Sequence, residues 1–258
     1  VSAFLGFQVS VITQSHSIIK HFWSTPIRSL FLFNIQTICV YIVHIMNLKE
    51  IIMTVIAITK FRPHAGKANL VLQNMRDVVS EFDKMGMTAR LSKDMLGPDA
   101  GCLNFSSFHE TFTDSMSGLE KVFSSDWWAK VQMRLDDNPS SDIVSPLNLI
   151  RTIAGGMHPS HRFFMWRWYL IKRDKMPEVM ELFPTLEEMC SKVDIKPVLL
   201  APVTGEPMSS MVIGYGAESM NHAGKAIDEM GMSEEYQQMV RKGAELGDLH
   251  RAWMSIPA

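Results

Sequence analysis

One order of predicted elements occurs twice after residue 53 and constrains the fold of this chain more than any other feature. Apolar residues follow a strand pattern, a helix pattern, two strand patterns around a turn, a second helix pattern and a last strand pattern. In the first half we expect these elements at 54–61, 66–86, 88–96, 102–110, 112–136 and 142–154. After a linker we expect them again at 162–172, 176–193, 196–203, 208–218, 221–246 and 249–257. The sequence therefore predicts β-α-β-β-α-β in tandem.

The second helical regions of the two halves align without a gap at an offset of 108 residues. In each, a serine (Ser125 or Ser233) precedes an acidic residue, and an aromatic residue (Trp128 or Tyr236) follows two positions later. Serine is a favoured N-cap residue, and an acidic side chain in the first turn interacts favourably with the helix dipole. Both serines are therefore predicted N-caps of helices that occupy the same place in the two halves.

The order β-α-β-β-α-β is that of the ferredoxin-like unit, whose sheet carries its helices on one face. The predicted strands 54–61 and 162–172 are apolar on both faces, which indicates burial on both sides. We therefore predict an α+β protein of two ferredoxin-like modules, 53–155 and 156–258. Their sheets pack against each other and close a single-chain barrel.

This plan resembles the dimeric α/β-barrel superfamily, which includes antibiotic-biosynthesis-monooxygenase-like and NIPSNAP-like domains. The resemblance covers residues 53–258 and rests on the repeated element order and on the second-helix sequence MSEEYQQMVRKGAEL. It implies a protein that binds a small molecule. Activities in the superfamily include cofactor-free oxygenation, haem chemistry and isomerisation, and some members have no known catalysis, so the fold does not fix the reaction.

Composition excludes several classes of function. The formal net charge is −2 and the basic residues are scattered, which argues against a nucleic-acid partner. The three cysteines lack metal-ligand spacing, and so sparse a set suits the reducing cytoplasm. The sequence contains no GxGxxG, P-loop or GxSxG motif. We therefore expect a cytoplasmic protein with no bound metal and no cofactor.

The first 52 residues are set apart from this pattern. Residues 29–46 contain no Asp, Glu, Lys or Arg and match the length of a membrane span, but Asn34 and His44 would be costly inside a bilayer. Three interpretations stay open: an untranslated leader with Met53 as the true start, a membrane anchor, or a soluble extension. Only the second would give the protein a membrane partner.

Two residues are candidates for catalysis. His109 lies at the end of a predicted strand, and its counterpart 108 residues later is Ala217. Arg167 shares one face of its strand with Phe163 and Met165, where a cation needs a buried acid or a bound anion as its partner. The histidines of the HPSH linker and His222 are weaker candidates for binding a metal.

Further residues are candidates for substrate binding because aromatic rings can hold an apolar substrate and polar groups can orient it. The aromatic candidates are Trp128, Trp166, Trp168 and Tyr215. Asn104 and Arg162 could orient or polarise the substrate. Large aromatic residues also serve as core packing, so each has that alternative role.

From these residues we expect a protein that binds a small, apolar or aromatic molecule between a sheet and its helices. The first hypothesis is a cofactor-independent oxygenase or isomerase, favoured if His109 or Arg167 faces a pocket. The alternative is a non-catalytic ligand-binding or assembly module, and a haem-binding protein is the second alternative. Self-association into a homo-oligomer is compatible with each of them.

Overall fold

The computed structural model describes residues 54–157, 161–205 and 207–258. The chain divides into two compact units, Val1–Glu50 and Ile51–Ala258, and every described residue lies in the second. The architecture below is therefore that of the second unit alone.

The predictions for residues 1–52, including the uncharged run at 29–46, lie outside the described residues, as does His158 in the linker. Among the residues that the structure does describe, no helix combines the length and the apolar character that crossing a membrane requires.

The first module has the predicted order of elements. Its elements are β1 (Val55–Pro63), α3 (Ala68–Lys84), β2 (Thr88–Leu96), β3 (Leu103–His109), α4 (Phe112–Phe123), α5 (Asp126–Asp137) and β4 (Ser141–Gly155). The helical region expected at 112–136 is two helices, because the Ser125 side chain accepts a hydrogen bond from the Trp128 backbone N–H and begins a new helix.

The second module repeats this order. Its elements are β5 (Phe163–Ile171), η1 (Arg173–Lys175), α6 (Met176–Ser191), β6 (Lys196–Pro202), β7 (Ser210–Ala217), α7 (Met220–Ala226), the π-helix η2 (Ile227–Gly231), α8 (Glu234–Leu246) and β8 (Gly247–Pro257). Ser233 caps α8 in the same way that Ser125 caps α5, by accepting from the Tyr236 backbone N–H. Both predicted N-caps are confirmed.

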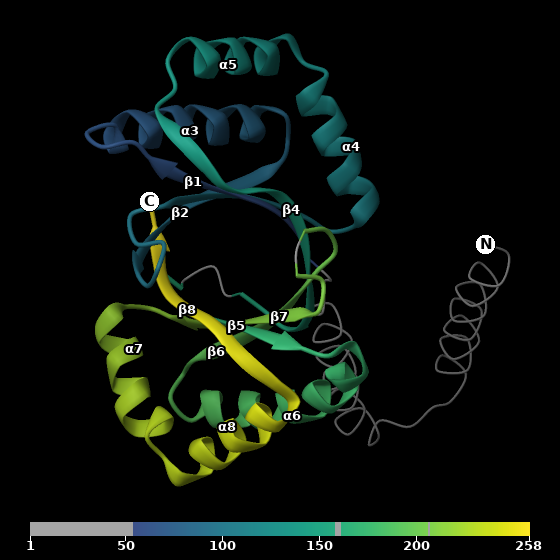
Figure 1. Ribbon diagram of the computed structural model, residues 1–258, viewed down its shortest axis with the longest axis vertical. Helices are drawn as coiled ribbons and strands as arrows, with labels where there is room; N and C mark the ends of the chain where they lie inside the picture. The colour runs from purple at the N-terminus through teal and green to yellow at the C-terminus, as the bar shows by residue number, and fades with distance from the viewer. Residues whose placement is uncertain (1–53, 158–160, 206) are drawn as a thin grey trace, which may run out of the picture. The chain divides into compact units, whose positions relative to one another are not determined.

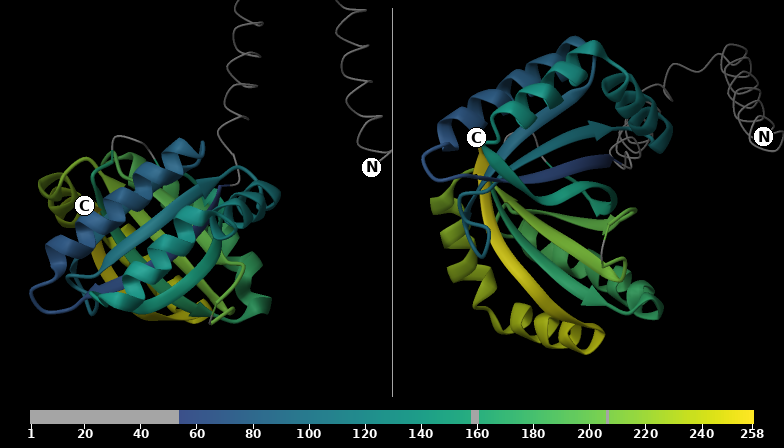
Figure 2. Two further views of the ribbon diagram at one scale, coloured as in Figure 1. Left: turned by 90° about the horizontal axis from the view of Figure 1, so that it is seen from above. Right: turned by 45° about the horizontal axis from the view of Figure 1, so that its top comes forward.

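The eight strands form one closed antiparallel barrel in the order β1-β3-β2-β8-β5-β7-β6-β4. Each module contributes four adjacent strands, and two seams, β2 with β8 and β4 with β6, join the modules. Helices α3, α4 and α5 cover one side of the barrel, and α6, α7 and α8 cover the opposite side (Figures 1 and 2). The predicted sheet-to-sheet barrel of two ferredoxin-like modules is confirmed.

Strand pairing keeps the 108-residue offset seen in the second helices. Val55 pairs with His109 in the first module, and Phe163 pairs with Ala217 in the second. The sheet positions of the two modules can therefore be compared residue by residue.

The core has three parts. One lies between the first sheet half and its helices, and includes Val71, Phe82 and Phe105. A second lies between the other sheet half and its helices, around Phe183 and Met211. The third fills the barrel interior, where side chains from both modules meet. Its members include Ile56, Phe108, Ile150, Trp166, Val198 and Leu200.

Two glycines of β7 make room for large rings inside the barrel. A Cβ atom on Gly214 would lie 2.3 Å from Cζ3 of Trp166, and one on Gly216 would lie 2.2 Å from Nδ1 of His161. The register of β7 with β5 and β6 is continuous at both positions. Glycine is therefore needed here for the close approach of side chains.

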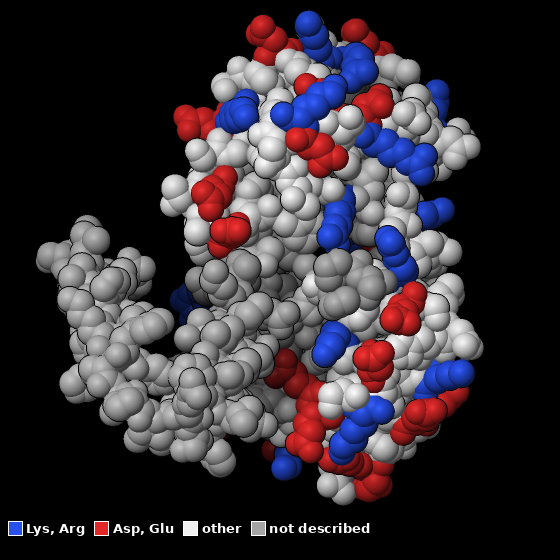
Figure 3. Space-filling view, turned by 180° about the vertical axis from the view of Figure 1, so that it is seen from behind, with Lys and Arg blue, Asp and Glu red and all other residues white. Residues whose placement is uncertain are grey.

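A group of charges around the buried Asp94 and Asp99 ties β8 to the first module. Lys60 Nζ contacts Asp94 Oδ2 at 2.8 Å and Asp99 Oδ2 at 3.0 Å. Arg62 and Arg251, the latter from β8, contact Asp99 at 3.1 and 2.8 Å. Burial alone would raise the pKa of Asp99, but these three cations outweigh it and hold the pKa below its usual value. Acidic and basic side chains are otherwise mixed over the face drawn in Figure 3.

Candidate functional site

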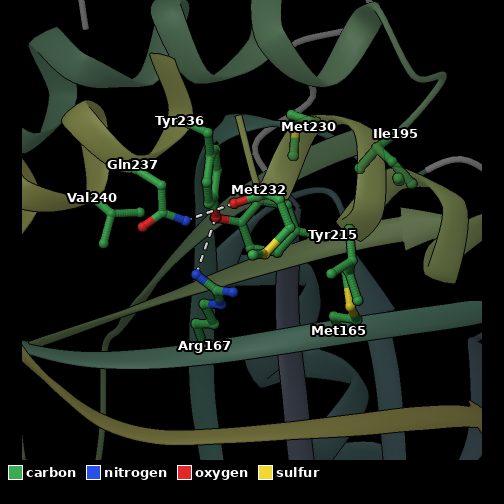
Figure 4. Close-up of a pocket in the computed structure, with 12 residues that line it drawn as sticks. Met165, Arg167, Ile195, Tyr215, Met230, Met232, Tyr236, Gln237 and Val240 are labelled. Carbon is green, nitrogen blue, oxygen red and sulfur yellow. Dashed lines mark hydrogen bonds between the residues drawn. The ribbon is translucent and has the colours of Figure 1, made fainter. Parts of the chain in front are cut away.

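A cavity of about 200 Å³ lies in the second module, between the sheet and the helices that cover it. Its floor is formed by β5 and β7, and its roof by α7, the π-helix and α8 (Figure 4). The lining is mostly apolar and includes three methionines. The lining residues are Met165, Arg167, Ile195, Tyr215, Ala226, Ile227, Met230, Gly231, Met232, Tyr236, Gln237 and Val240.

Arg167 projects from β5 into this cavity, and its partners there are phenols. Its Nη1 atom donates a hydrogen bond of 3.0 Å to the hydroxyl oxygen of Tyr236, which lies on α8. The guanidinium carbon lies 5.8 Å from the ring centre of Tyr215 and 6.0 Å from that of Tyr236. The two hydroxyl oxygens are 3.4 Å apart. Arg167 and Tyr215, both predicted site residues, are thus brought together.

The guanidinium of Arg167 and the neighbouring phenols of Tyr215 and Tyr169 shift one another's pKa values. Burial alone would lower the pKa of Arg167, but the oxygens of Tyr236, Tyr215 and Tyr169 outweigh it and raise the pKa. Burial raises the pKa of Tyr215 well above its usual value, and that of Tyr169 is raised for the same reason. The cavity therefore holds a permanent cation beside the neutral phenol of Tyr215.

The roof of the cavity is held by hydrogen bonds to the turn between α7 and α8. Gln237 Nε2 donates to the carbonyl oxygen of Gly231 at 2.6 Å, and Ser233 Oγ donates to that of Met230 at 2.6 Å. The single π-helical turn Ile227–Gly231 brings its side chains over the floor. Such turns are rare and are frequent at functional sites.

His109 lies in the other module, so the structure does not bring the two catalytic candidates together. Its side chain faces the first helical layer, where Gly118 of α4 approaches Cε1, and Nε2 lies 3.0 Å from Ser107 Oγ. Burial lowers the pKa of His109, and the charge of Asp114 opposes this only in part. His109 is therefore a buried, neutral side chain.

The other polar candidates also lie away from the cavity. Asn104 is buried and donates to Asp94 Oδ1 at 2.9 Å, within the charge group that joins the modules. Arg162 is exposed. Trp128 packs on α5 against Trp127 and Phe123, with ring centres 5.9 and 5.6 Å apart.

Trp166 and Trp168 lie on the opposite face of β5 from Arg167. Trp166 stacks with Phe164 and Trp253 at 5.4 and 6.2 Å, and its Nε1 donates to Ser255 Oγ at 2.8 Å. Trp168 contacts the ring of His250 edge-to-face at 5.0 Å. Both tryptophans lie on the barrel side of the strand, away from this cavity.

A second hollow, of about 470 Å³, lies on the outer surface between α3 and α5. Its lining is mainly charged and includes Glu81, Lys84 and Arg134. It does not offer the apolar surroundings that small-molecule pockets usually have. The cavity around Arg167 is therefore the stronger candidate site.

Comparisons with known proteins agree with the architecture. No protein-family model and no curated protein sequence matches the chain. Among solved structures, an anthrone oxidase-like protein aligns with a TM-score of 0.58 and 10% identity, over 80% of this chain and 92% of its own. A proposed monooxygenase from Fusobacterium nucleatum aligns with a TM-score of 0.56 and 8% identity, over 81% and 94%. A proposed chlorite dismutase aligns with a TM-score of 0.52 and 9% identity, over 80% and 95%.

These solved structures share the fold of this chain, a closed antiparallel barrel with helices on two sides. At these identities the likeness concerns the fold alone. What a barrel of this sequence does must therefore be argued from its own cavity.

Haem is one group that this barrel fold suggests, and the residues of the cavity do not fit it. Its lining includes no His or Cys, and although Tyr and Met can also ligate haem iron and are present, the size of the cavity argues against the group. Its volume of about 200 Å³ is below the roughly 300 Å³ at which pockets for drug-sized molecules begin, and a porphyrin exceeds most such molecules. The described residues also contain no group of three or more His, Cys, Asp or Glu that could hold a metal ion.

Several cavity residues were not among the sequence candidates: Tyr236, Gln237, Met165, Met230 and Met232. Tyr236 could have been found, because the helix alignment already placed it as the counterpart of Trp128. The methionines could not, because the 20 in the chain give no pattern that separates core filler from pocket lining.

Proposed function

We propose that this protein binds a small, mostly apolar molecule in the cavity of the second module, with an oxygen atom of the ligand directed at Arg167. The observation that carries this proposal is the position of Arg167, a cation that lines an otherwise apolar cavity. Small-molecule sites combine an apolar wall with a few polar groups that fix orientation in the same way.

We propose further that the binding supports oxygenase or isomerase chemistry without a cofactor. A guanidinium beside a carbonyl oxygen stabilises the enolate that forms when a proton leaves the adjacent carbon. That anion is the starting point for both isomerisation and direct reaction with O₂. The lining contains no Asp, Glu or His to take the proton, so the substrate must be acidic enough at that carbon to release the proton to water.

Native mass spectrometry of the full chain, purified from cells without added ligand, tests the binding. We expect a bound species of small mass that is absent from a Val240→Trp variant, because an indole at this partly exposed lining position fills the cavity. Leu249→Trp, an equally large change at an exposed residue outside the lining, is the control. Loss of the ligand from both variants, or from neither, would place it elsewhere.

The non-catalytic alternative is tested with the ligand once its mass is known. Incubation of the full chain with that compound in air should consume O₂ or change the absorption spectrum of the compound. An unchanged compound, recovered after many equivalents have been offered, would favour a ligand carrier over an enzyme.

We also propose that the protein self-associates and acts in the cytosol. The segment 141–148 of β4 pairs only with β1 among the described strands and exposes Ile143, Val144 and Leu147. An open strand edge with apolar residues favours pairing with a second copy. Light scattering should show a dimer that Val144→Lys converts to a monomer.

The cytosolic location is supported by the cysteines that the structure describes. Cys102 and Cys190 are free thiols, and burial raises the pKa of Cys190 to about 12.

A further inference from the structure

We propose that the ligand of this cavity is a single-ring aromatic compound that carries one anionic oxygen group, a carboxylate or a phenolate. The inference rests on the proposed function, since it names the class of molecule that the cavity takes. Three observations lead to it: the charge of the site, the size of the cavity, and the kind of hydrogen-bonding groups that remain free in it.

The first observation is an uncompensated positive charge. The lining contains one Arg and no Asp or Glu, and Arg167 forms no ion pair with any residue that the structure describes. Its polar partner, Tyr236, is a phenol, and the neighbouring Tyr215 is held neutral by burial. Arg167 is partly buried, and the phenol oxygens around it favour its charged form, but none of the lining residues is an acid that would supply the opposite charge. An anionic ligand would supply that charge, and a neutral one would not.

The second observation is the volume. A dry protein cavity of about 150 Å³ is known to hold benzene. The cavity here measures about 200 Å³, which leaves room for one ring and a small substituent and excludes three fused rings. Met165, Met230 and Met232 lie around it, and thioethers contact aromatic rings favourably.

The third observation is that Arg167 and Tyr236 offer hydrogen-bond donors to the cavity. The Tyr236 oxygen accepts from Arg167, so its own proton is available for a second partner. Its contact with the Tyr215 oxygen is long, at 3.4 Å. Arg167 also hydrogen-bonds to Tyr169, and its other N–H groups are donors as well. A carboxylate or phenolate oxygen, which only accepts, fits this set.

Titration calorimetry of the full chain with three single-ring probes and one larger compound, anthracene-9-carboxylate, tests the inference. The single-ring probes are benzoate, benzamide and toluene. We expect benzoate to bind at least 10-fold more tightly than benzamide, and anthracene-9-carboxylate not to bind. In Arg167→Met the preference for benzoate over benzamide should be lost. Arg162→Met is the control, because Arg162 is exposed and directly precedes β5, and there the preference should be kept.

The outcomes separate this inference from the proposed function. If benzamide and toluene bind as well as benzoate, and Val240→Trp abolishes all three, the cavity is a binding site and the anion inference is overturned. If no single-ring probe binds to the unaltered chain, the inference is overturned, and the native mass spectra decide the proposed function separately. The comparison among probes uses the unaltered protein, so the test stands even if Arg167→Met does not fold.

Discussion

The guanidinium of Arg167 and the phenol of Tyr236 meet across the cavity, from a strand and from a helix, through a hydrogen bond of 3.0 Å. The pair links the floor of the site to its roof. Tyr236 occupies the place of the carboxylate that usually pairs with a partly buried arginine, and the site therefore stays electropositive.

We predict that Tyr236→Phe lowers the free energy of unfolding by about 1.5–3 kcal/mol, the range for a hydrogen bond to a charged group. The ring remains, so packing changes little. Tyr215→Phe is the matched control, because its hydroxyl contact is longer, and we expect a loss of at most about 1 kcal/mol. Urea denaturation measures both, and equal losses would contradict the central position given to Tyr236.

The second prediction concerns Gly214. In Gly214→Ala the new Cβ would collide with Trp166, and the stability should fall by about 1–3 kcal/mol, as for an overpacked core. Gly224→Ala is the control, because nothing lies within 4 Å of its Cβ position in α7. There we expect a gain of about 0.5–1 kcal/mol from helix propensity. Thermal unfolding of both variants gives the comparison, and a stable Gly214→Ala would mean that Trp166 is not fixed.

The third prediction concerns the seam between β2 and β8. Asp99→Asn leaves Lys60, Arg62 and Arg251 without their shared carboxylate, and we expect a loss of about 3 kcal/mol. Asp142→Asn removes an exposed partner of His64 and should change stability by about 1 kcal/mol or less. A small effect of Asp99→Asn in denaturant titrations would show that the barrel seam holds without these charges.

The fourth prediction is a pH dependence from His109. Burial lowers the pKa of His109 in the folded protein, whereas the unfolded chain has an ordinary value near 6.5. Below about pH 6.5 the unfolded state therefore binds a proton more readily than the folded state does, and the free energy of unfolding falls as pH falls. The slope contributed is at most about 1.4 kcal/mol per pH unit.

His109→Asn should remove this part of the pH dependence between pH 7 and 5. Melting temperatures of the two proteins, measured across that range, should converge toward low pH. Parallel curves would mean that His109 is protonated in the fold as readily as in the unfolded chain. His250→Asn, at an exposed residue, is the control.

The architecture could be predicted from the sequence because its determinants are local. β-branched runs, turn residues and the caps at Ser125 and Ser233 set the order of elements, and the double-sided burial of the strand at 163–171 required a closed structure. Arg167 was also identifiable, since a charge on an apolar strand face needs a partner.

The position of the cavity could not be predicted in this way. Both modules have a helical layer over a sheet, but in one of them Trp128 and His109 pack against their neighbours, whereas in the other Tyr236 and Arg167 border a hollow. Which helical layer leaves a cavity over its sheet depends on how side chains of similar character pack in three dimensions. The periodicity of the sequence predicts only the face of the helix or strand on which each side chain lies.

One of the two seams that close the barrel, β2 with β8, joins the residues that lie farthest apart along the chain. Residue 94 pairs with 255 there, whereas the other seam pairs residue 150 with 202, and β1 and β4 of one module pair residue 55 with 151. Contacts between distant residues form late, because the entropy of closing a long loop opposes them. We therefore expect the β2–β8 seam to close last. The intermediate would be one open sheet of eight strands, and the rate at which its two ends meet would determine how long the edges of β2 and β8 stay available for aggregation.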